Sequence, residues 1–308
     1  MKLIGDPHLG REFRAHVPLD RIGDREKMMF EQFERELNES SDTTVIVGDL
    51  FDRPLVSIQT LWKTLDIIIS ASASQPNRKI IIMAGNHDLN KATEVRGSFH
   101  VLGVALERVP NVYVLLEPTV IDDVAYFPWQ YEKTAEEQVE VFNALPSTAI
   151  GHWDLESFGD HDSHLCPARS LRAKGVDTIY SGHWHIAGTY TVDSFDVICT
   201  GSMQPMTHAE DPKGNMYVTL NLTDYEAKDD SYFANRYVRV RCIKGEEVTP
   251  PTTCLGFKLE PIDPEAVETE RVNLGNFDMN DILNQAFTSF EIPTEIQSFI
   301  KEKIHAYG

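Results

Sequence analysis

Five short apolar segments of this chain end in the same way, and this repetition constrains the fold more than any other feature. Each segment is too short for a helix and is rich in β-branched residues, which is typical of a buried strand. Each then runs into glycine and Asp, Asn or His. The junctions are Gly5-Asp6-Pro7-His8, Gly48-Asp49-Leu50-Phe51-Asp52-Arg53, Gly85-Asn86-His87-Asp88, Gly151-His152 and Gly182-His183-Trp184-His185. Because ligands gather at the carboxyl ends of strands in open α/β sheets, we expect these side chains to share one site.

Helical patterns lie between the strand-like segments. In residues 24–38, Met29, Phe33 and Leu37 recur every four residues, as on the buried face of a helix. Similar periodicity predicts helices over 56–70, which the polar residues 74–77 end, and over 134–145, with Thr134 as N-cap. Further strands are expected at 111–115 and 124–127, and strands with turns over 188–222. This order of strands and helices predicts an α/β fold.

The length of 308 residues allows one large domain and a smaller one. We expect the large domain to span 1–224. Residues 225–277 include a Pro-rich, acidic stretch from 246 to 276 with little periodicity, which indicates a linker or a small additional unit. Residues 278–308 carry two amphipathic helical patterns separated by Pro293.

Composition excludes some classes of protein. No apolar run approaches the length of a membrane helix, and no signal segment precedes the first strand, so we expect a cytoplasmic protein. The four cysteines lack metal or redox spacing and are expected to be reduced thiols. The formal net charge of −20 argues against a broad basic groove. Such a protein binds nucleic acid poorly unless cations or a partner offset its charge.

The polar residues at the strand ends supply oxygen and imidazole ligands but no thiolate, which suits manganese, iron or zinc. Seven candidate ligands are too many for one ion, and a carboxylate can bridge two ions. We therefore predict two ions that share Asp49. The first would also bind Asp6, His8 and His185, and the second Asn86, His152 and His183. Two ions about 3.5–4 Å apart can activate water and hold a phosphate for in-line displacement.

Each of these residues also has an ordinary interpretation. Asp6 alone fits an N-cap, Asn86 alone fits a turn, and a single histidine is more often surface or core than ligand. That default applies to the histidines outside the five junctions, which are His16, His100, His161, His164 and His305. The five junctions together are much harder to attribute to chance.

In order along the chain, the five junctions resemble the five motifs of the calcineurin-like metallophosphoesterases, over about residues 1–220. Within that superfamily, Asp6-Pro7-His8-Leu9-Gly10 resembles the opening motif of SbcD-type DNA-repair nucleases. The segments Gly151-His152-Trp153-Asp154-Leu155, Gly201-Ser202-Met203-Gln204-Pro205 and Glu210-Asp211-Pro212-Lys213-Gly214 resemble the nuclease subunit of tailed-phage recombination endonucleases.

The resemblance implies a fold, a cofactor and partners. The fold would be a sandwich of two sheets flanked by helices, with a small C-terminal extension in which 225–277 is a short capping region or linker. The cofactor would be two divalent ions, manganese first, with iron, zinc and magnesium as alternatives. The protein would cleave DNA phosphodiesters as an exonuclease or endonuclease, in the host cytoplasm if a phage encodes it. Its partners would be DNA, an SMC-like coiled-coil ATPase and a second copy of the chain, with no membrane.

The resemblance also implies roles for single residues. His87 would be the general acid that protonates the leaving 3′ oxygen, with Asp88 orienting its other ring nitrogen. Asp52 would position ligands, and Arg53 would either contact phosphate or cap the next helix. Weaker candidates for DNA contacts are the basic residues Arg11, Arg14, Arg21, Arg25, Arg169, Arg172, Lys174, Arg236, Arg239 and Arg241, although runs of charge are usually a solvated face. Trp129, Trp153 and Phe158 would either stack on bases or, as is more common, pack the rim of the site.

Two other functions remain open from the sequence. One is a phosphatase or phosphodiesterase that acts on a small molecule or a phosphoprotein, although phosphoprotein phosphatases typically place glycine after the arginine that corresponds to Arg53, and Pro54 stands here. The other is a scaffold with an inactive metal site, which the complete ligand set argues against. The helices over 278–308 would either dock on the ATPase coiled coil or fold back on the core.

Overall fold

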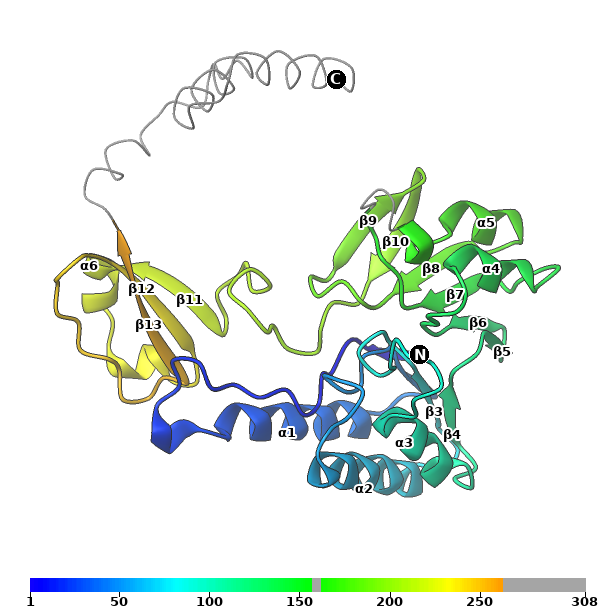
Figure 1. The fold of residues 1–308 in the computed structure, drawn as a ribbon, viewed down its shortest axis with the longest axis horizontal. Coiled ribbons are helices and arrows are strands. Elements are labelled where there is room, and N and C mark those ends of the chain that lie inside the picture. Colours follow the sequence, from blue (N-terminus) through cyan, green and yellow to red (C-terminus); the bar gives the residue numbers. More distant parts are fainter. Residues whose placement is uncertain (157–161, 263–308) are drawn as a thin grey trace, which may run out of the picture. The chain divides into compact units, whose positions relative to one another are not determined.

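The computed structural model describes residues 1–156 and 162–262 (Figure 1). The contacts within the chain divide it into two units. One comprises 1–241 and 248–260, and the other 242–247 and 261–308. All the junction motifs lie in the first unit. The predicted helices over 278–308 and Phe158 lie outside the described residues, so their roles stay predictions.

The first sheet is parallel throughout, in the order β1-β2-β3-β4. Its strands are β1 (Lys2–Ile4), β2 (Thr43–Ile46), β3 (Lys79–Met83) and β4 (Val112–Leu115). Three helices pack on its outer face, as Figure 1 shows: α1 (Asp24–Asn38), α2 (Ile58–Ser74) and α3 (Ser98–Leu106). Phe33 and Ile68 from these helices join Ile46 of the sheet in one buried cluster, which explains the periodicity of the helices.

The second sheet is mixed, in the order β5-β6-β7-β8-β10-β9. Its strands are β5 (Thr119–Ile121), β6 (Val124–Phe127), β7 (Thr148–Gly151), β8 (Thr178–Ser181), β9 (Gly188–Val192) and β10 (Phe195–Cys199). Two short helices, α4 (Ala135–Glu140) and α5 (Ala168–Ala173), share a buried cluster with its outer face. Val45, Met83 and Ile150 belong to a cluster that both sheets contribute to. The predicted two-sheet sandwich flanked by helices is therefore confirmed.

A third sheet follows the sandwich along the chain. It contains β11 (Tyr217–Asn221), β12 (Tyr237–Ile243) and β13 (Gly256–Ile262), with α6 (Leu222–Glu226) after its first strand. The sheet takes residues from both sides of position 224, because β11 pairs with β12 in parallel. β13 forms in the Pro-rich stretch where the sequence pattern predicted no regular element. Single-turn 3₁₀ segments occur at Leu19–Arg21, Asp162–His164 and Asp230–Phe233.

Several element boundaries differ from the prediction for physical reasons. Thr134 caps α4 as expected and forms a capping box with Glu137, but the helix ends at Glu140 because the Phe142 N–H bonds to the Val139 carbonyl in a tighter turn. Helix α2 starts two residues later and ends four residues later than predicted. Helix α3 was missed because its sequence is apolar on most sides and lacks a clear stripe.

The described helices include none that is long and apolar enough to cross a membrane. The four cysteines, Cys166, Cys199, Cys242 and Cys254, are buried and free, as predicted for reduced thiols. They have no part in the cluster of polar residues at the strand ends.

Candidate metal centre

The junction residues meet because the strands before them are parallel and in register. Ile4 of β1 pairs with Ile46 of β2, which pairs with Ile82 of β3, so the loops after these strands leave the same edge of the first sheet. In the second sheet, Gly151 of β7 pairs with Ser181 of β8. The His152 Nδ1 lies 2.8 Å from the Val47 carbonyl oxygen and donates to it, which joins the two edges.

The first group of predicted ligands contains Asp6, His8 and His185, and one ligand atom from each lies within 4.8 Å of the others. The His8 Nε2 is 3.1 Å from the His185 Nε2. The His185 Nε2 is 3.7 Å from Asp6 Oδ2. Two imidazole nitrogens and a carboxylate oxygen therefore converge on one point, as a divalent cation requires.

The second group contains Asp49, His152 and His183, also within 4.8 Å of one another. The Asn86 Oδ1 joins them, at 3.0 Å from His152 Nε2 and 2.9 Å from His183 Nδ1. The sequence predicted these same four residues as one ligand set. The second group includes an amide oxygen, from Asn86, which the first group lacks.

Asp49 lies between the two groups. Its Oδ2 is 3.7 Å from His8 Nε2 and 3.5 Å from His152 Nε2. A single carboxylate therefore faces one imidazole of each group. This is the arrangement that the sequence predicted for a shared ligand.

Buried polar atoms at this site lack the partners that burial requires. Both Asp6 carboxylate oxygens and the His8 Nδ1 are buried and have no hydrogen-bond partner. An orphaned buried carboxylate is costly, and burial accordingly raises the pKa of Asp6 to about 7 and lowers the pKa of His8 to about 4. A cation bound with His8 Nε2 and His185 would satisfy the Asp6 oxygens, whereas His8 Nδ1 points toward Asp52, 3.7 Å away. The residues present thus fit a metal centre, in which each of the two groups would hold one ion.

Charge within the site opposes the effect of burial at the central pair. Burial alone would raise the pKa of Asp49, but the imidazole of His152 beside it holds that pKa well below its usual range. Burial would likewise lower the pKa of His152. The Asp49 carboxylate more than offsets the effect of burial and raises the pKa of His152 to about 9. Asp49 is therefore held in its ionised form.

The backbone of the site is strained. Four predicted ligands have positive φ, which is uncommon for residues other than glycine: Asp6 (31°), His8 (46°), Asp49 (47°) and His183 (72°). Such strain costs on the order of 1–3 kcal/mol per residue and clusters at functional sites. Gly85 is required by close approach, because a Cβ there would lie 2.1 Å from Asp49 Oδ1.

His87 does not belong to the first group, but it forms a further candidate ligand group with His8 and Asp52, whose ligand atoms lie within 4.8 Å of one another. Its ring is 4.8 Å from the His8 ring and nearly perpendicular to it. Its Nδ1 is 2.8 Å from the backbone carbonyl oxygen of Asp52, which can only accept, so Nδ1 carries the proton there and Nε2 is the nitrogen left for substrate. The His87 backbone N–H donates to Asp49 Oδ1 at 2.8 Å.

The prediction that Asp88 orients His87 is wrong. The buried Asp88 carboxylate accepts hydrogen bonds from three backbone N–H groups, those of Leu50, Phe51 and Gly85, at 2.8 to 3.2 Å. Burial and the nearby Asp49 raise its pKa to about 8. Asp88 thus ties two junction loops together, while the carbonyl of Asp52 does the orienting. The adjacency of Asp88 and His87 in sequence does not translate into contact, because neighbouring loop side chains can diverge.

Asp52 links the predicted basic residues to the site. Its Oδ1 is 3.7 Å from His8 Nδ1 and 3.3 Å from Arg11 Nη1, and its Oδ2 is 3.4 Å from Arg53 Nη2. Two arginines therefore stand next to the first group, on the side of His87. Arg14 differs, because it is exposed and lies 3.4 Å from Glu12.

Two carboxylates that were not predicted as site residues contact predicted ligands. Asp154 Oδ1 is 2.8 Å from His183 Nε2, and Glu210 Oε2 is 3.3 Å from His185 Nδ1. Such outer carboxylates fix the ring orientation of a ligating histidine and raise its basicity. Asp154 was detectable as a carboxylate two residues after His152. Glu210 stands in a segment that the family resemblance had singled out, but nothing in the sequence placed it at His185, which it reaches from a loop beyond β10.

Aromatic rings cover the second group. Trp129 is buried and stacks on His183, with ring centroids 5.5 Å apart, and on His164 at 3.9 Å. The Tyr131 hydroxyl donates to the Asn86 carbonyl at 3.0 Å. Trp153 is buried under the sheet at 2% exposure, so it packs and does not reach substrate.

The remaining predicted basic residues lie elsewhere. Arg25 is buried and donates to the Pro205 carbonyl, and Arg21 binds the carbonyl of Thr253, so both have structural roles. The other residues of this set lie on α5 or near it (Arg169, Arg172, Lys174) and on or just before β12 (Arg236, Arg239, Arg241). None of these is among the groups that hold the predicted ligands.

Comparison with known proteins identifies the family. The model of the calcineurin-like phosphoesterases matches residues 2–187, which is more than half of the chain. No curated protein matches the chain in sequence. The solved structure "GAP50 the anchor in the inner membrane complex of Plasmodium" shares 12% identity over 66% of this chain and 71% of that chain, with a TM-score of 0.35, too low to carry an argument. With its junction motifs gathered at one edge of a two-sheet sandwich, the chain belongs to the calcineurin-like phosphoesterase family, whose members are metal-dependent phosphoester hydrolases.

Proposed function

We propose that the chain is the nuclease subunit of a DNA recombination or repair complex and that it hydrolyses DNA phosphodiesters with two manganese ions. The observation that carries the proposal is the position of His87 and two arginines beside one of two ligand groups that face a common carboxylate, Asp49. The resemblance to SbcD-type and tailed-phage nucleases supplies the substrate class. Oxygen and imidazole ligands also suit iron, zinc and magnesium.

The chain's own residues supply positioning and a proton. Bound ions would act as Lewis acids on the phosphate and lower the pKa of a bound water. Arg11 and Arg53 would hold the non-bridging oxygens of the phosphate. Their shared contact with Asp52 keeps both guanidinium groups next to His8. As an imidazolium, with its Nδ1–H held by the Asp52 carbonyl, His87 would deliver its second proton from Nε2 to the leaving 3′ oxygen and become the neutral imidazole.

The test compares three substrates on one preparation of the full chain with manganese. End-labelled linear duplex DNA represents the proposed class, bis(p-nitrophenyl) phosphate represents small diesters, and p-nitrophenyl phosphate represents monoesters. We expect cleavage of the DNA to be the most efficient by kcat/KM. Efficient monoester hydrolysis with intact DNA would favour the phosphatase alternative, and no hydrolysis of any substrate would favour the inactive scaffold.

We also propose an SMC-like coiled-coil ATPase as the partner, bound through residues 278–308. The support is the resemblance together with the amphipathic pattern of Phe299, Ile300 and Ile304 in the sequence. Deletion of 278–308 should leave a metal-loaded nuclease that no longer co-purifies with the ATPase. Retained co-purification would reject this docking segment, and an insoluble truncation would favour helices that fold back on the core.

A further inference from the structure

A cavity of about 330 Å³ lies outside the metal centre, between the segment after the first junction and the third sheet. Its walls come from three parts of the chain that are distant in sequence: 11–16, 206–208, and the strand residues 217, 237–239 and 256–258. All belong to the first unit. The volume is at the lower end of the range for small-molecule sites, which suits one compact ligand.

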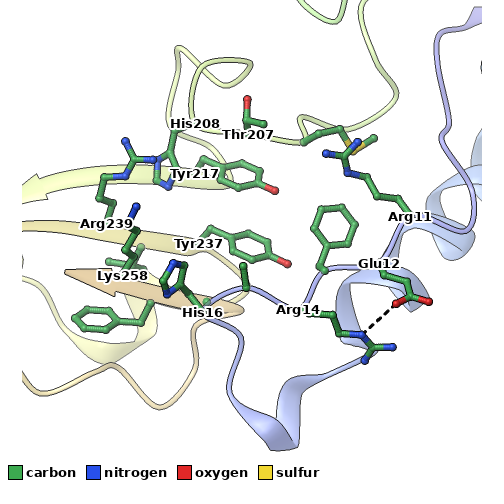
Figure 2. A pocket seen from close by; sticks show the side chains of 16 residues that line it. Arg11, Glu12, Arg14, His16, Thr207, His208, Tyr217, Tyr237, Arg239 and Lys258 are labelled. Atoms are coloured by element: carbon green, nitrogen blue, oxygen red, sulfur yellow. Dashed lines mark hydrogen bonds and ion pairs between the residues drawn. The ribbon is translucent and has the colours of Figure 1, made fainter. Parts of the chain in front are cut away.

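One wall of the cavity is aromatic. Tyr217 and Tyr237 stack with centroids 4.7 Å apart and planes 9° apart, and Figure 2 shows their hydroxyls pointing the same way. Phe13 lies 6.1 Å from Tyr237, and Arg11 and Arg25 lie over the Phe13 ring at 5.8 and 5.1 Å. The tyrosines are only 7% and 8% exposed, whereas Phe13 is half-buried and presents more of its surface. A planar apolar group would find aromatic contacts here.

Four basic side chains also line the cavity, although the chain as a whole is acidic. Arg11, Arg14, Arg239 and Lys258 line the cavity, and Glu12 is the one carboxylate among the lining residues. The arginines lie near carboxylates: Arg11 is 3.3 Å from Asp52, Arg14 3.4 Å from Glu12 and Arg239 3.8 Å from Glu260. The whole chain has a net charge of −20, so positive charge is concentrated at this place. Figure 2 shows Arg239 and Lys258 at one end of the tyrosine pair and Arg11 at the other. Such a lining favours an anionic ligand.

Two contacts join the cavity to the metal centre. Arg11 lines the cavity and lies 3.3 Å from Asp52, which faces His8. Met206 also lines it, and its backbone N–H donates to Glu210 at 2.7 Å, the carboxylate beside His185. Asp52 and Glu210 therefore connect the cavity lining to two residues of the first ligand group, His8 and His185.

We infer that this cavity binds one nucleotide unit of the substrate, with its base against the aromatic wall and a phosphate between the basic side chains. The inference rests on the proposed function and deepens it, because it assigns a subsite for the nucleotide next to the scissile bond. Stacking of a base on aromatic side chains is sequence-tolerant and contributes about 1–3 kcal/mol per base. Base stacking would let this acidic chain bind DNA without a broad basic groove.

The test measures equilibrium binding to the manganese-loaded full chain by calorimetry. The probe is a phosphonate analogue of 2′-deoxyadenosine 5′-monophosphate, in which a methylene group replaces the bridging 5′ oxygen so that it is not hydrolysed. The comparison probes are the same phosphonate without the base, and 2′-deoxyadenosine. We expect the complete analogue to bind at least tenfold more tightly than either fragment.

Matched variants locate the binding. Arg239→Gln combined with Lys258→Gln should weaken binding of the complete analogue about tenfold or more. Lys91→Gln combined with Arg108→Gln removes the same charge from exposed positions outside the cavity and should change the affinity less than twofold. Lys258→Gln alone, at an exposed position, provides a second readout if the double variant unfolds.

The outcomes separate this inference from the proposed function. Equal affinity for the analogue with and without its base, or equal affinity in the cavity and control variants, would overturn the nucleotide subsite even if DNA is cleaved. Specific binding of the analogue by a chain that cleaves no DNA would keep the subsite and reject the nuclease.

Discussion

The metal centre and the cavity beside it are encoded in different ways. Every predicted ligand of the metal centre stands within four residues of a strand end, so its place follows from the strand order and register alone. The cavity joins residues 11–16 to β11, β12 and β13, more than 190 positions away in sequence. The contrast teaches that chemistry at sheet edges is visible in local motifs, whereas the surface that selects a substrate depends on long-range packing.

The largest effect should come from the residue shared by both ligand groups. Asp49→Asn removes the charge that faces His8 and His152, so both ions should be lost and hydrolysis should fall to background. The measurement is the metal stoichiometry of the purified variant. Asp66→Asn, at an exposed position of α2, is the matched control. Two ions retained at wild-type affinity would refute the shared ligand.

A smaller loss is expected at the proton donor. His87→Ala should keep both ions and lose about 10²–10⁴-fold in kcat, the usual contribution of general acid–base catalysis. Single-turnover cleavage and metal content of the same sample distinguish the roles. Unchanged cleavage would remove His87 from the mechanism, and loss of an ion would make it a ligand.

These two predictions show how far the sequence reaches. The five junctions predicted the two-sheet fold and the set of residues, His87 among them, that the structure brings together, because each depends on a strand and the loop that follows it. Asp88 was predicted to contact His87, but its carboxylate accepts hydrogen bonds from backbone N–H groups instead. Glu210 was missed as a site residue because it contacts His185 from a loop that is distant in sequence. Strand β13 was missed because local periodicity is weak in its Pro-rich surroundings.

Substitutions of the two outer carboxylates, Asp154 and Glu210, test whether a residue distant in sequence matters to the metal centre as much as a local one. Asp154→Asn should weaken metal binding at the second group, and Glu210→Gln at the first, each by about 10–100-fold, as is typical of partners that orient a ligating histidine. Separate titrations of the two sites with manganese check this. If only Asp154→Asn has an effect, the distant carboxylate is not part of the centre.

The smallest effect concerns stability and pH. In metal-free protein the folded-state pKa is raised to about 7 for Asp6, 8 for Asp88 and 9 for His152. A raised pKa means that the folded chain holds the proton more tightly, so the stability it contributes is lost as pH rises through that pKa. Metal-free protein should therefore melt lower at pH 8 than at pH 6.5. Manganese should stabilise more at pH 8, because it replaces protons. Melting curves with and without chelator check both trends. A melting temperature of the metal-free protein that rises from pH 6.5 to pH 8 would contradict the first.

The central claim is that two ions lie on either side of Asp49. Anomalous diffraction from crystals of the full chain soaked in manganese tests it most directly. The account predicts two peaks about 3.5–4 Å apart. One should be bound by Asp6, His8 and His185 and the other by Asn86, His152 and His183, with Asp49 touching both. A single peak, or two peaks that do not share Asp49, would contradict it.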